Sequence, residues 1–307
     1  MIRRLTEVEQ LYRKNRYERY DKGDLNIKHL SGHRFANVLL TLLVKLQRIS
    51  KRQKLIIVND RRENKRKPII FSPTHIGGVD IEMVFEGIRV PAWLMLADPR
   101  ELYRSFSGAM LDLNGVIVFD SDHRKDRHIA KLRSIELLRS GTNLIIFSEG
   151  AYNISPNQLV MHPYAGTAEI AIEANADIVP IALVRDGKRY YINIGKNIDI
   201  INYSLEQKYE LSGLLRDNLA TLLWEIIEQL PITRRNTINK HYYEEVFLKE
   251  MFADIGNYTY TIDDMEETIF RPKGIAESDD VFAFMDDLQP KRENAFLFRL
   301  KMKSHGV

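Results

Sequence analysis

A histidine and an aspartate stand five positions apart directly after an apolar run. The stretch Phe71-Ser-Pro-Thr-His-Ile-Gly-Gly-Val-Asp80 contains both, with His75 first. An aspartate about one helical turn beyond a histidine can bond one imidazole nitrogen, which fixes the tautomer and leaves the other nitrogen as a general base. The same spacing also suits an aspartate that caps a helix beside a loop histidine. His75 and Asp80 are therefore the first candidate catalytic pair, with helix capping as the alternative.

A second apolar run also leads into a loop that carries a charged residue. The stretch Ile145-Ile-Phe-Ser-Glu-Gly-Ala-Tyr-Asn153 contains Glu149, which can bond a substrate hydroxyl or organise the amides of its own loop. Gly150 suits a backbone turn at that point. A third run, Val179-Pro-Ile-Ala182, contains a proline that can shape a pocket wall. Neither of these segments alone indicates a particular reaction.

Short apolar runs alternate with helical patterns between residues 55 and 202. This alternation is typical of βα units around a mostly parallel sheet with flanking helices. In such sheets ligands bind beyond the carboxyl ends of the strands, which is where His75 is expected. The expected strands are residues 55–58, 69–72, 92–96, 115–119, 144–147, 178–183 and 190–194, and the clearest helices are 126–139, 166–174 and 204–230.

Three parts are expected along the chain. Residues 1–54 form a basic helical arm, residues 55–202 an α/β domain, and residues 203–307 a helical and acidic extension with short helices near 241–253 and 279–287. The arm includes an amphipathic helix over residues 35–49, in which apolar positions recur at three- and four-residue steps. We expect its apolar face to pack on the domain, with burial in a membrane interface as the alternative.

The net charge of +3 conceals an uneven distribution of charged residues. Residues 1–67 contain 19 Lys and Arg against 7 Asp and Glu, whereas residues 241–290 contain 3 against 13. A basic leading segment suits an anionic surface such as a membrane or nucleic acid, or is simply a solvated face. The acidic segment can contact the basic one within the fold, or repel a membrane from the far side.

The chain contains no cysteine, which excludes disulfides, cysteine-ligated zinc and a thiol nucleophile. The longest charge-free stretch near the N-terminus, residues 35–44, is much shorter than the roughly 20 residues of a membrane-spanning helix. Arg3 and Arg4 lead into a polar segment, unlike the start of a signal peptide. We therefore expect a cytoplasmic protein without a spanning segment.

Taken together, the candidate segments resemble the lysophosphatidic acid and glycerol-3-phosphate acyltransferases. Four blocks of that family are present in its order, namely Thr74-His-Ile-Gly-Gly-Val-Asp80, Gly115-Val-Ile-Val-Phe-Asp120, Phe147-Ser-Glu-Gly150 and Val179-Pro-Ile-Ala182. The resemblance covers residues 55–200 or so and implies the α/β fold of these acyltransferases. It also implies a reaction in which His75 takes a proton from an acceptor hydroxyl, Asp80 orients His75, and the activated oxygen attacks an acyl thioester.

The resemblance further implies the partners of the reaction. Acyl carrier protein or acyl-CoA would donate a fatty acyl group to a lysolipid or glycerolipid acceptor, without a cofactor, and amides around Ile76–Gly78 are candidate donors to the oxyanion. Two rivals use the same fold: a thioesterase, in which water replaces the acceptor, and an inactive membrane-binding module. A metal site is disfavoured because His75 and Asp80 lack further ligands at a recognisable spacing.

Three cations that the family places around the acceptor phosphate are absent at their expected positions. Glu149-Gly150 is followed by Ala151-Tyr-Asn153 instead of Thr-Arg, Asp120-Ser-Asp122 replaces an arginine, and His162-Pro-Tyr-Ala-Gly166 replaces a stretch with a lysine. An acceptor without a terminal phosphomonoester is therefore an open alternative to lysophosphatidic acid.

Other side chains can take the place of those cations. Arg124, Lys125 and Arg127 can supply positive charge from a shifted loop, or they form the solvated start of a helix. Tyr152 and Asn153 can bond the hydroxyls of a sugar or glycerol head group. We take Arg124, Lys125, Glu149, Gly150, Tyr152 and Asn153 as candidate substrate-binding residues.

A lipid acceptor also requires the protein to reach a bilayer. The basic arm and the apolar face of residues 35–49 suit peripheral docking on the inner face of an anionic membrane, which salt would weaken. The sequence contains no nucleic-acid motif, and its aromatic residues do not interleave with the basic ones along a strand. We expect a membrane surface, and no nucleic acid, as partner.

Overall fold

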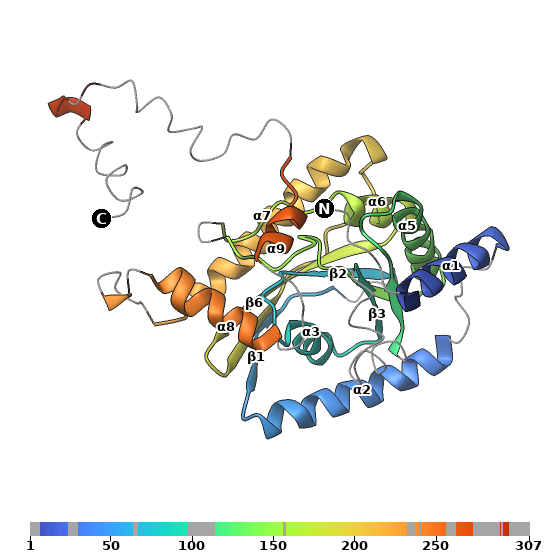
Figure 1. Ribbon diagram of the computed structural model, residues 1–307, viewed down its shortest axis with the longest axis horizontal. Coiled ribbons are helices and arrows are strands. Elements are labelled where there is room, and N and C mark those ends of the chain that lie inside the picture. Colours follow the sequence, from blue (N-terminus) through green and yellow to red (C-terminus); the bar gives the residue numbers. More distant parts are fainter. Residues whose placement is uncertain are drawn as a thin grey trace. The chain divides into compact units, whose positions relative to one another are not determined.

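Figure 1 shows the computed structural model of the chain. The structure describes residues 7–23, 30–63, 67–97, 114–155, 158–231, 237–239, 241–255, 262–272, 289 and 291–294. The chain divides into two compact units, residues 1–270 and 271–307. The second unit contributes a short 3-10 helix, η5 (Arg292–Asn294), and the helix expected at 279–287 lies outside the described residues. The boundaries expected at 54/55 and 202/203 stay predictions.

A seven-stranded sheet forms the centre of the first unit. Its strands are β1 (Lys54–Asp60), β2 (Ile69–Pro73), β3 (Ala92–Leu96), β4 (Val116–Val118), β5 (Asn143–Ile145), β6 (Asp177–Asp186) and β7 (Arg189–Ile194), in the order β1-β7-β6-β2-β5-β3-β4. Every neighbouring pair is parallel except β6 and β7, which form an antiparallel pair. The predicted mostly parallel sheet is therefore confirmed, and each predicted strand overlaps an observed one.

Helices lie before the first strand, between some successive strands and after the last strand. They are α1 (Glu7–Asp21), α2 (Leu30–Ser50), α3 (Asp80–Ile88), α5 (Arg124–Arg139), α6 (Gly166–Ala174), η1 (Leu205–Gln207), α7 (Lys208–Ile227), the π-helical η3 (Tyr243–Phe247), α8 (Leu248–Ile255) and α9 (Ile262–Thr268). The helices expected at 126–139, 166–174, 204–230 and near 241–253 correspond to α5, α6, α7 with η1, and η3 with α8.

Both faces of the sheet are covered, because successive side chains of a strand point to opposite faces. Ile70 and Leu144 belong to the core cluster that includes residues of α5, α6 and α7. Their neighbours Phe71 and Ile145 belong to the other cluster, which includes residues of α3. All four side chains are fully buried, which explains why the central strands read as continuous apolar runs and not as alternating ones.

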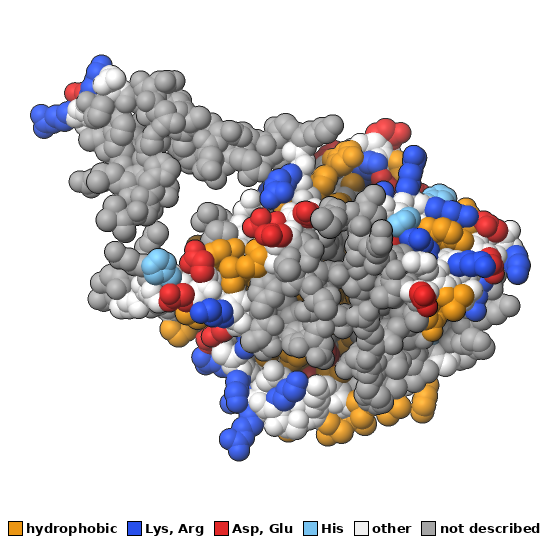
Figure 2. Space-filling model, in the orientation of Figure 1, with side chains coloured by type: hydrophobic (Ala, Val, Ile, Leu, Met, Phe, Trp, Pro, Cys, Tyr) orange, Lys and Arg blue, Asp and Glu red, His pale blue; other side chains and the backbone are white. Residues whose placement is uncertain are grey.

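Helix α2 presents its apolar side chains to solvent, contrary to the expected packing on the domain. The exposed residues are Phe35, Val38, Leu39, Leu42, Leu43, Leu46 and Ile49, each at least 41% exposed. We call them the α2 stripe. In Figure 2 hydrophobic side chains line the lower margin of the molecule, along which α2 runs in Figure 1. The membrane-interface alternative predicted this orientation.

The side of α2 that faces the domain is small and polar, which accounts for the orientation of the helix. His33, Asn37 and Ala36 are buried, and the Asn37 amide donates to Asn114 Oδ1 at 2.9 Å. Near the other end of the helix, the guanidinium of Arg48 donates to both carboxylate oxygens of Glu86 on α3, at 2.7 and 2.8 Å. These partners lie on the domain, so α2 docks through its polar side and leaves the stripe outside.

No helix in the part of the chain that the structure describes combines the length and apolarity needed to span a membrane.

Candidate active site

The loop between β2 and α3 brings His75 and Asp80 together. His75 follows β2 by two residues and Asp80 is the first residue of α3. Gly77 and Gly78 adopt φ values of +80° and +66° between them, a conformation that favours glycine. The turn places His75 Nδ1 2.7 Å from Asp80 Oδ2.

Asp80 is buried and accepts several hydrogen bonds. Its Oδ2 accepts from the amides of Ile76 and Gly77 at 3.0 and 2.9 Å, and its Oδ1 accepts from the amide of Ile81 at 2.8 Å. The position of Asp80 at the start of α3 favours negative charge on its carboxyl group. With the proton assigned to Nδ1, His75 donates to Asp80 and its Nε2 is left as an acceptor.

The bond to His75 agrees with the first interpretation of the spacing, whereas the N-cap of α3 is Val79 and no side chain caps the helix. Asp80 orders the loop through its amides and orients His75 at the same time. The bonds to these amides also remove Ile76 and Gly77 from the expected oxyanion donors, because both amides are directed to Asp80.

Two aromatic rings contact the imidazole of His75. The ring centroid of Phe147 lies 4.2 Å from that of His75, and the ring centroid of Tyr152 lies at 4.1 Å. The His75 side chain is 15% exposed. The imidazole is thus restrained by packing on two rings and remains partly exposed.

Glu149 organises two loops through both of its carboxylate oxygens. Oε1 accepts from the amide of His75 at 3.1 Å, and Oε2 accepts from the amide of Met161 at 2.8 Å. Burial raises the pKa of Glu149 to about 7, while these two amide bonds lower it. Of the two roles considered for Glu149, the geometry supports the organisation of loop amides.

Gly150 allows a close contact with an aromatic ring. It adopts φ +73°, and a Cβ atom there would lie 2.6 Å from Cε2 of Tyr164. The amide of Tyr164 donates to the carbonyl of Ser148 at 2.8 Å, which fixes the ring over the loop. Gly150 therefore shapes the loop.

Asn153 has a local structural role in the observed loop. Its side-chain amide donates to the carbonyls of Gln158 and Leu159 at 3.0 and 3.1 Å, and its Oδ1 accepts from the amide of Ser155 at 3.0 Å. Its backbone amide donates to the carbonyl of His75 at 2.9 Å. The loop that follows Glu149 is thereby tied to the loop that carries His75.

The basic residues at the start of α5 do not gather at His75. Arg124 and Lys125 are exposed, and Lys125 Nζ lies 3.1 Å from Asp21 and 4.7 Å from the ring centre of Tyr17, both on α1. Strand β4, which leads to α5, is three strands from β2, a separation of about 14 Å at the usual strand spacing.

Buried carboxylates neutralise the cations of α1 beside the second block. Arg16 donates to both carboxylate oxygens of Asp126, at 3.0 and 2.5 Å, and Arg13 lies 3.3 Å from Asp120. These ion pairs dock α1 on α5. The sequence did not indicate them, because the partners are more than 100 residues apart.

Hydroxyl groups that were not predicted from the sequence hold the segments next to His75 and Glu149 in place. Thr74 Oγ1 accepts from the amide of Leu183 on β6 at 2.9 Å. Ser148 Oγ lies 2.5 Å from Ser72 Oγ and 2.8 Å from Thr167 Oγ1. The position of Ser72, Thr74 and Ser148 at the ends of apolar runs is the sequence signal from which these bonds could have been predicted.

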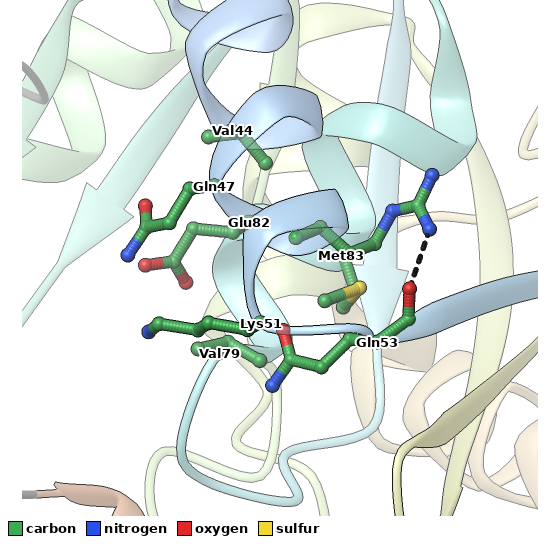
Figure 3. A pocket seen from close by; sticks show the side chains of 8 residues that line it. Val44, Gln47, Lys51, Gln53, Val79, Glu82 and Met83 are labelled. Carbon is green, nitrogen blue, oxygen red and sulfur yellow. Dashed lines mark hydrogen bonds between the residues drawn. The ribbon is translucent and has the colours of Figure 1, made fainter.

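A small hollow lies between the end of α2 and the start of α3 (Figure 3). Glu82 lines it together with Gln47, Lys51 and Val79, and Figure 3 shows its carboxylate between the side chains of Gln47 and Lys51. Burial, with a smaller contribution from Asp80, raises the pKa of Glu82 to about 7, and Lys51 opposes this. The contact between the two helices therefore contains a half-buried carboxyl group with a raised pKa.

The described residues contain no cluster of three or more His, Asp or Glu side chains able to hold a metal ion.

Comparison with known proteins shows similarity to acyltransferases over part of the chain. Residues 54–184 match the family model described as acyltransferase. The 1-acyl-sn-glycerol-3-phosphate acyltransferase of Borreliella burgdorferi is 23% identical over 182 residues, which are 55% of this chain and 72% of that protein.

A solved structure supports the fold. The crystal structure of the 1-acyl-sn-glycerophosphate acyltransferase PlsC from Thermotoga maritima matches 66% of this chain and 83% of its own, with a TM-score of 0.53 and 14% sequence identity. The four sequence blocks all lie, in order, within the segment that matches the family model. Residues 54–184 therefore resemble the acyltransferase family.

Proposed function

We propose that this protein transfers a fatty acyl group from an acyl thioester to the hydroxyl of a lysolipid or glycerolipid acceptor. The hydrogen bond of 2.7 Å between His75 Nδ1 and the buried carboxylate of Asp80 carries the proposal. It leaves Nε2 of His75 as the proton acceptor that such a reaction needs. The name of the Borreliella relative makes 1-acylglycerol-3-phosphate the nearest analogy for the acceptor.

The reaction proceeds in two steps at His75. Nε2 takes the proton of the acceptor hydroxyl as its oxygen attacks the thioester carbonyl, and the carbonyl electrons move to oxygen to give a tetrahedral oxyanion. When the intermediate collapses, the carbon–sulfur bond breaks and the imidazolium returns the proton to the leaving thiolate. Acyl carrier protein or acyl-CoA supplies the thioester, and the chemistry requires no cofactor or enzyme nucleophile.

The charges around the second block bear on the acceptor. Arg13 and Arg16 are paired with Asp120 and Asp126, so these two arginines are already engaged and are less suited to hold a phosphomonoester. This favours an acceptor with a less anionic head group. Acylation rates for lysophosphatidic acid and for neutral lysolipids would test it, and a strong preference for the phosphomonoester would contradict it.

A single assay tests the reaction class. Purified protein is incubated with labelled acyl-acyl carrier protein or acyl-CoA and a mixed lysolipid pool, and the labelled lipid is identified. We expect acceptor-dependent transfer that His75→Ala abolishes without loss of folding. Thioester breakdown without an acceptor would indicate a thioesterase instead, and retention of most transfer by folded His75→Ala protein would refute the mechanism.

We also propose that the α2 stripe docks the protein peripherally on the inner face of the cytoplasmic membrane. Seven large apolar side chains exposed along one helix are costly in water and suit the interface of a bilayer. Arg34, Lys45, Lys51 and Arg52 are exposed on the same helix or directly after it, where they can attract anionic lipid. Because α2 packs on α3, docking brings lipid near the element that carries Asp80.

A further inference from the structure

The helices after residue 240 cover the loop that follows Glu149. Ile154, in this loop, is 2% exposed and forms a core cluster with Leu248 and Met251 of α8 and Met265 of α9. Tyr152, Tyr243, Phe247 and Ile269 pack against this cluster. The cluster lies outside the two that cover the sheet, and its helical members come after the segment that matches the family model.

Two tyrosine hydroxyls bond these helices to the segment between β5 and α6. Tyr243 donates to the carbonyl of Ile154 at 2.6 Å, and Tyr164 donates to the carbonyl of Thr268 at 2.6 Å. The ring of Tyr164 also lies 4.9 Å from that of Phe270. Burial raises the pKa of both phenols, so both remain protonated donors at neutral pH.

The same loop contacts the catalytic histidine. Between Glu149 and Ile154, Tyr152 places its ring 4.1 Å from the imidazole of His75, and the amide of Asn153 donates to the carbonyl of His75. Tyr152 thus packs against His75 on one side and against the cluster with α8 and α9 on the other. A continuous set of contacts connects the C-terminal helices to the imidazole.

We propose that η3, α8 and α9 are a positioning element for His75, and that Tyr152 and Tyr243 are its positioning residues. The inference rests on the proposed acyl transfer. Tyr243 holds the carbonyl of Ile154, the cluster holds Tyr152, and the ring of Tyr152 restricts the orientation of the imidazole. In this proposal Tyr152 acts through the packing of its ring, whereas the sequence predicted a hydroxyl contact to substrate.

Variants of the full chain test this proposal through kcat and KM. Because small displacements of a catalytic group cost large factors in rate, we expect Tyr152→Ala to lower kcat by roughly tenfold or more. Tyr152→Phe keeps the ring and should stay within about twofold of wild type, since only packing is needed. Tyr243→Phe should lower kcat by about fivefold with unchanged KM, the effect of one hydrogen bond. Tyr242→Phe, an exposed neighbour, is the matched control.

A spectroscopic measurement separates this proposal from the reaction itself. The imidazole ¹H–¹⁵N signals of His75, assigned by their loss in His75→Ala, should shift in Tyr152→Ala and Tyr243→Phe and stay in place in Tyr242→Phe. If wild-type protein transfers no acyl group, the proposed function fails, while these signals still report on positioning. A Tyr243→Phe protein with a lower Tm but unchanged His75 signals and kcat would overturn the proposal. A loss of activity in Tyr152→Phe equal to that in Tyr152→Ala would do so as well.

Discussion

Glu149 Oε1 accepts a hydrogen bond from the backbone amide of His75 at 3.1 Å, so a carboxylate after β5 holds the loop after β2. The other oxygen holds Met161, at the far end of the loop that contains Tyr152. One buried carboxyl group therefore joins the loop after β2, the loop after β5 and the segment at Met161.

Replacement of Glu149 should disturb the geometry of the site while leaving His75, the proposed general base, in place. In Glu149→Gln one acceptor oxygen becomes a donor and faces an amide, which costs about 1–3 kcal/mol for the unsatisfied group. We expect kcat for acyl transfer to fall by roughly 10- to 100-fold and the Tm to drop. Steady-state kinetics and calorimetry measure both, with exposed Glu228→Gln as control; unchanged kinetics would show that the loop is held by other contacts.

Asp80→Asn tests the assignment of the imidazole tautomer. An amide in this position can donate to Nδ1, which would place the remaining proton on Nε2 and block the general base. We expect kcat to fall by about 10²- to 10⁴-fold with little change in KM. A variant that retains a tenth or more of the wild-type kcat would show that Asp80 mainly caps the loop.

Glu82 should make stability depend on pH. Because its pKa is raised to about 7 in the folded protein, the folded state binds more protons than the unfolded state between about pH 4.5 and 7. The contribution of this group to stability is fully present below that window and is lost as the pH rises through it.

Substitution of Glu82 should therefore remove part of this dependence. Glu82→Gln should raise the free energy of unfolding at pH 8 by about 1–2 kcal/mol relative to wild type and change it less at pH 5. Urea unfolding at both pH values checks this, with Glu228→Gln as the control. Equal changes at the two pH values would mean that Glu82 does not titrate between α2 and α3 as described.

Charged residues in the α2 stripe should weaken membrane binding. Leu42→Glu with Leu46→Glu removes two exposed apolar side chains, each worth about 1.5–3 kcal/mol on full burial, so partition to anionic vesicles should weaken on the order of 100-fold. Leu205→Glu with Leu214→Glu makes an equivalent change at other exposed positions and should bind like wild type.

Co-sedimentation at low and high salt measures this binding. Salt should weaken the binding of wild type, because the basic residues contribute through screened charges. Wild-type protein that fails to bind anionic vesicles at low salt, or equal binding by both double variants, would contradict docking through α2.

The sheet and the dyad could be predicted because their signals are local. Each apolar run such as that containing Ile70 and Phe71 became a strand, and the short separation of His75 and Asp80 let one turn bring them together. The direction in which α2 faces could not be predicted in this way. It depends on Asn114 and Glu86, whose positions relative to the helix arise only from the fold.

The acceptor-binding residues show the same limit. Lys125 is near the second block in sequence, but its amine contacts Asp21 and Tyr17 of α1, and no pattern within α5 indicates that partner. Asn153 has the chemistry to bind a hydroxyl, yet its side chain closes its own loop. Composition and spacing identify which groups are available, while distant parts of the chain determine what those groups bond.

Helix α3 carries Asp80 at its first residue and Glu86, the partner of Arg48 on α2, near its last turn. Nine residues of helix measure about 13 Å, so one rigid helix connects Asp80, the partner of His75, to the contact with α2. If α2 docks on a membrane as proposed, the fold fixes the distance between the imidazole and the bilayer. A flexible linker would let that distance vary. The acceptor hydroxyl must reach the imidazole at that distance. The protein would therefore select acceptors by the depth at which their head group lies in the membrane.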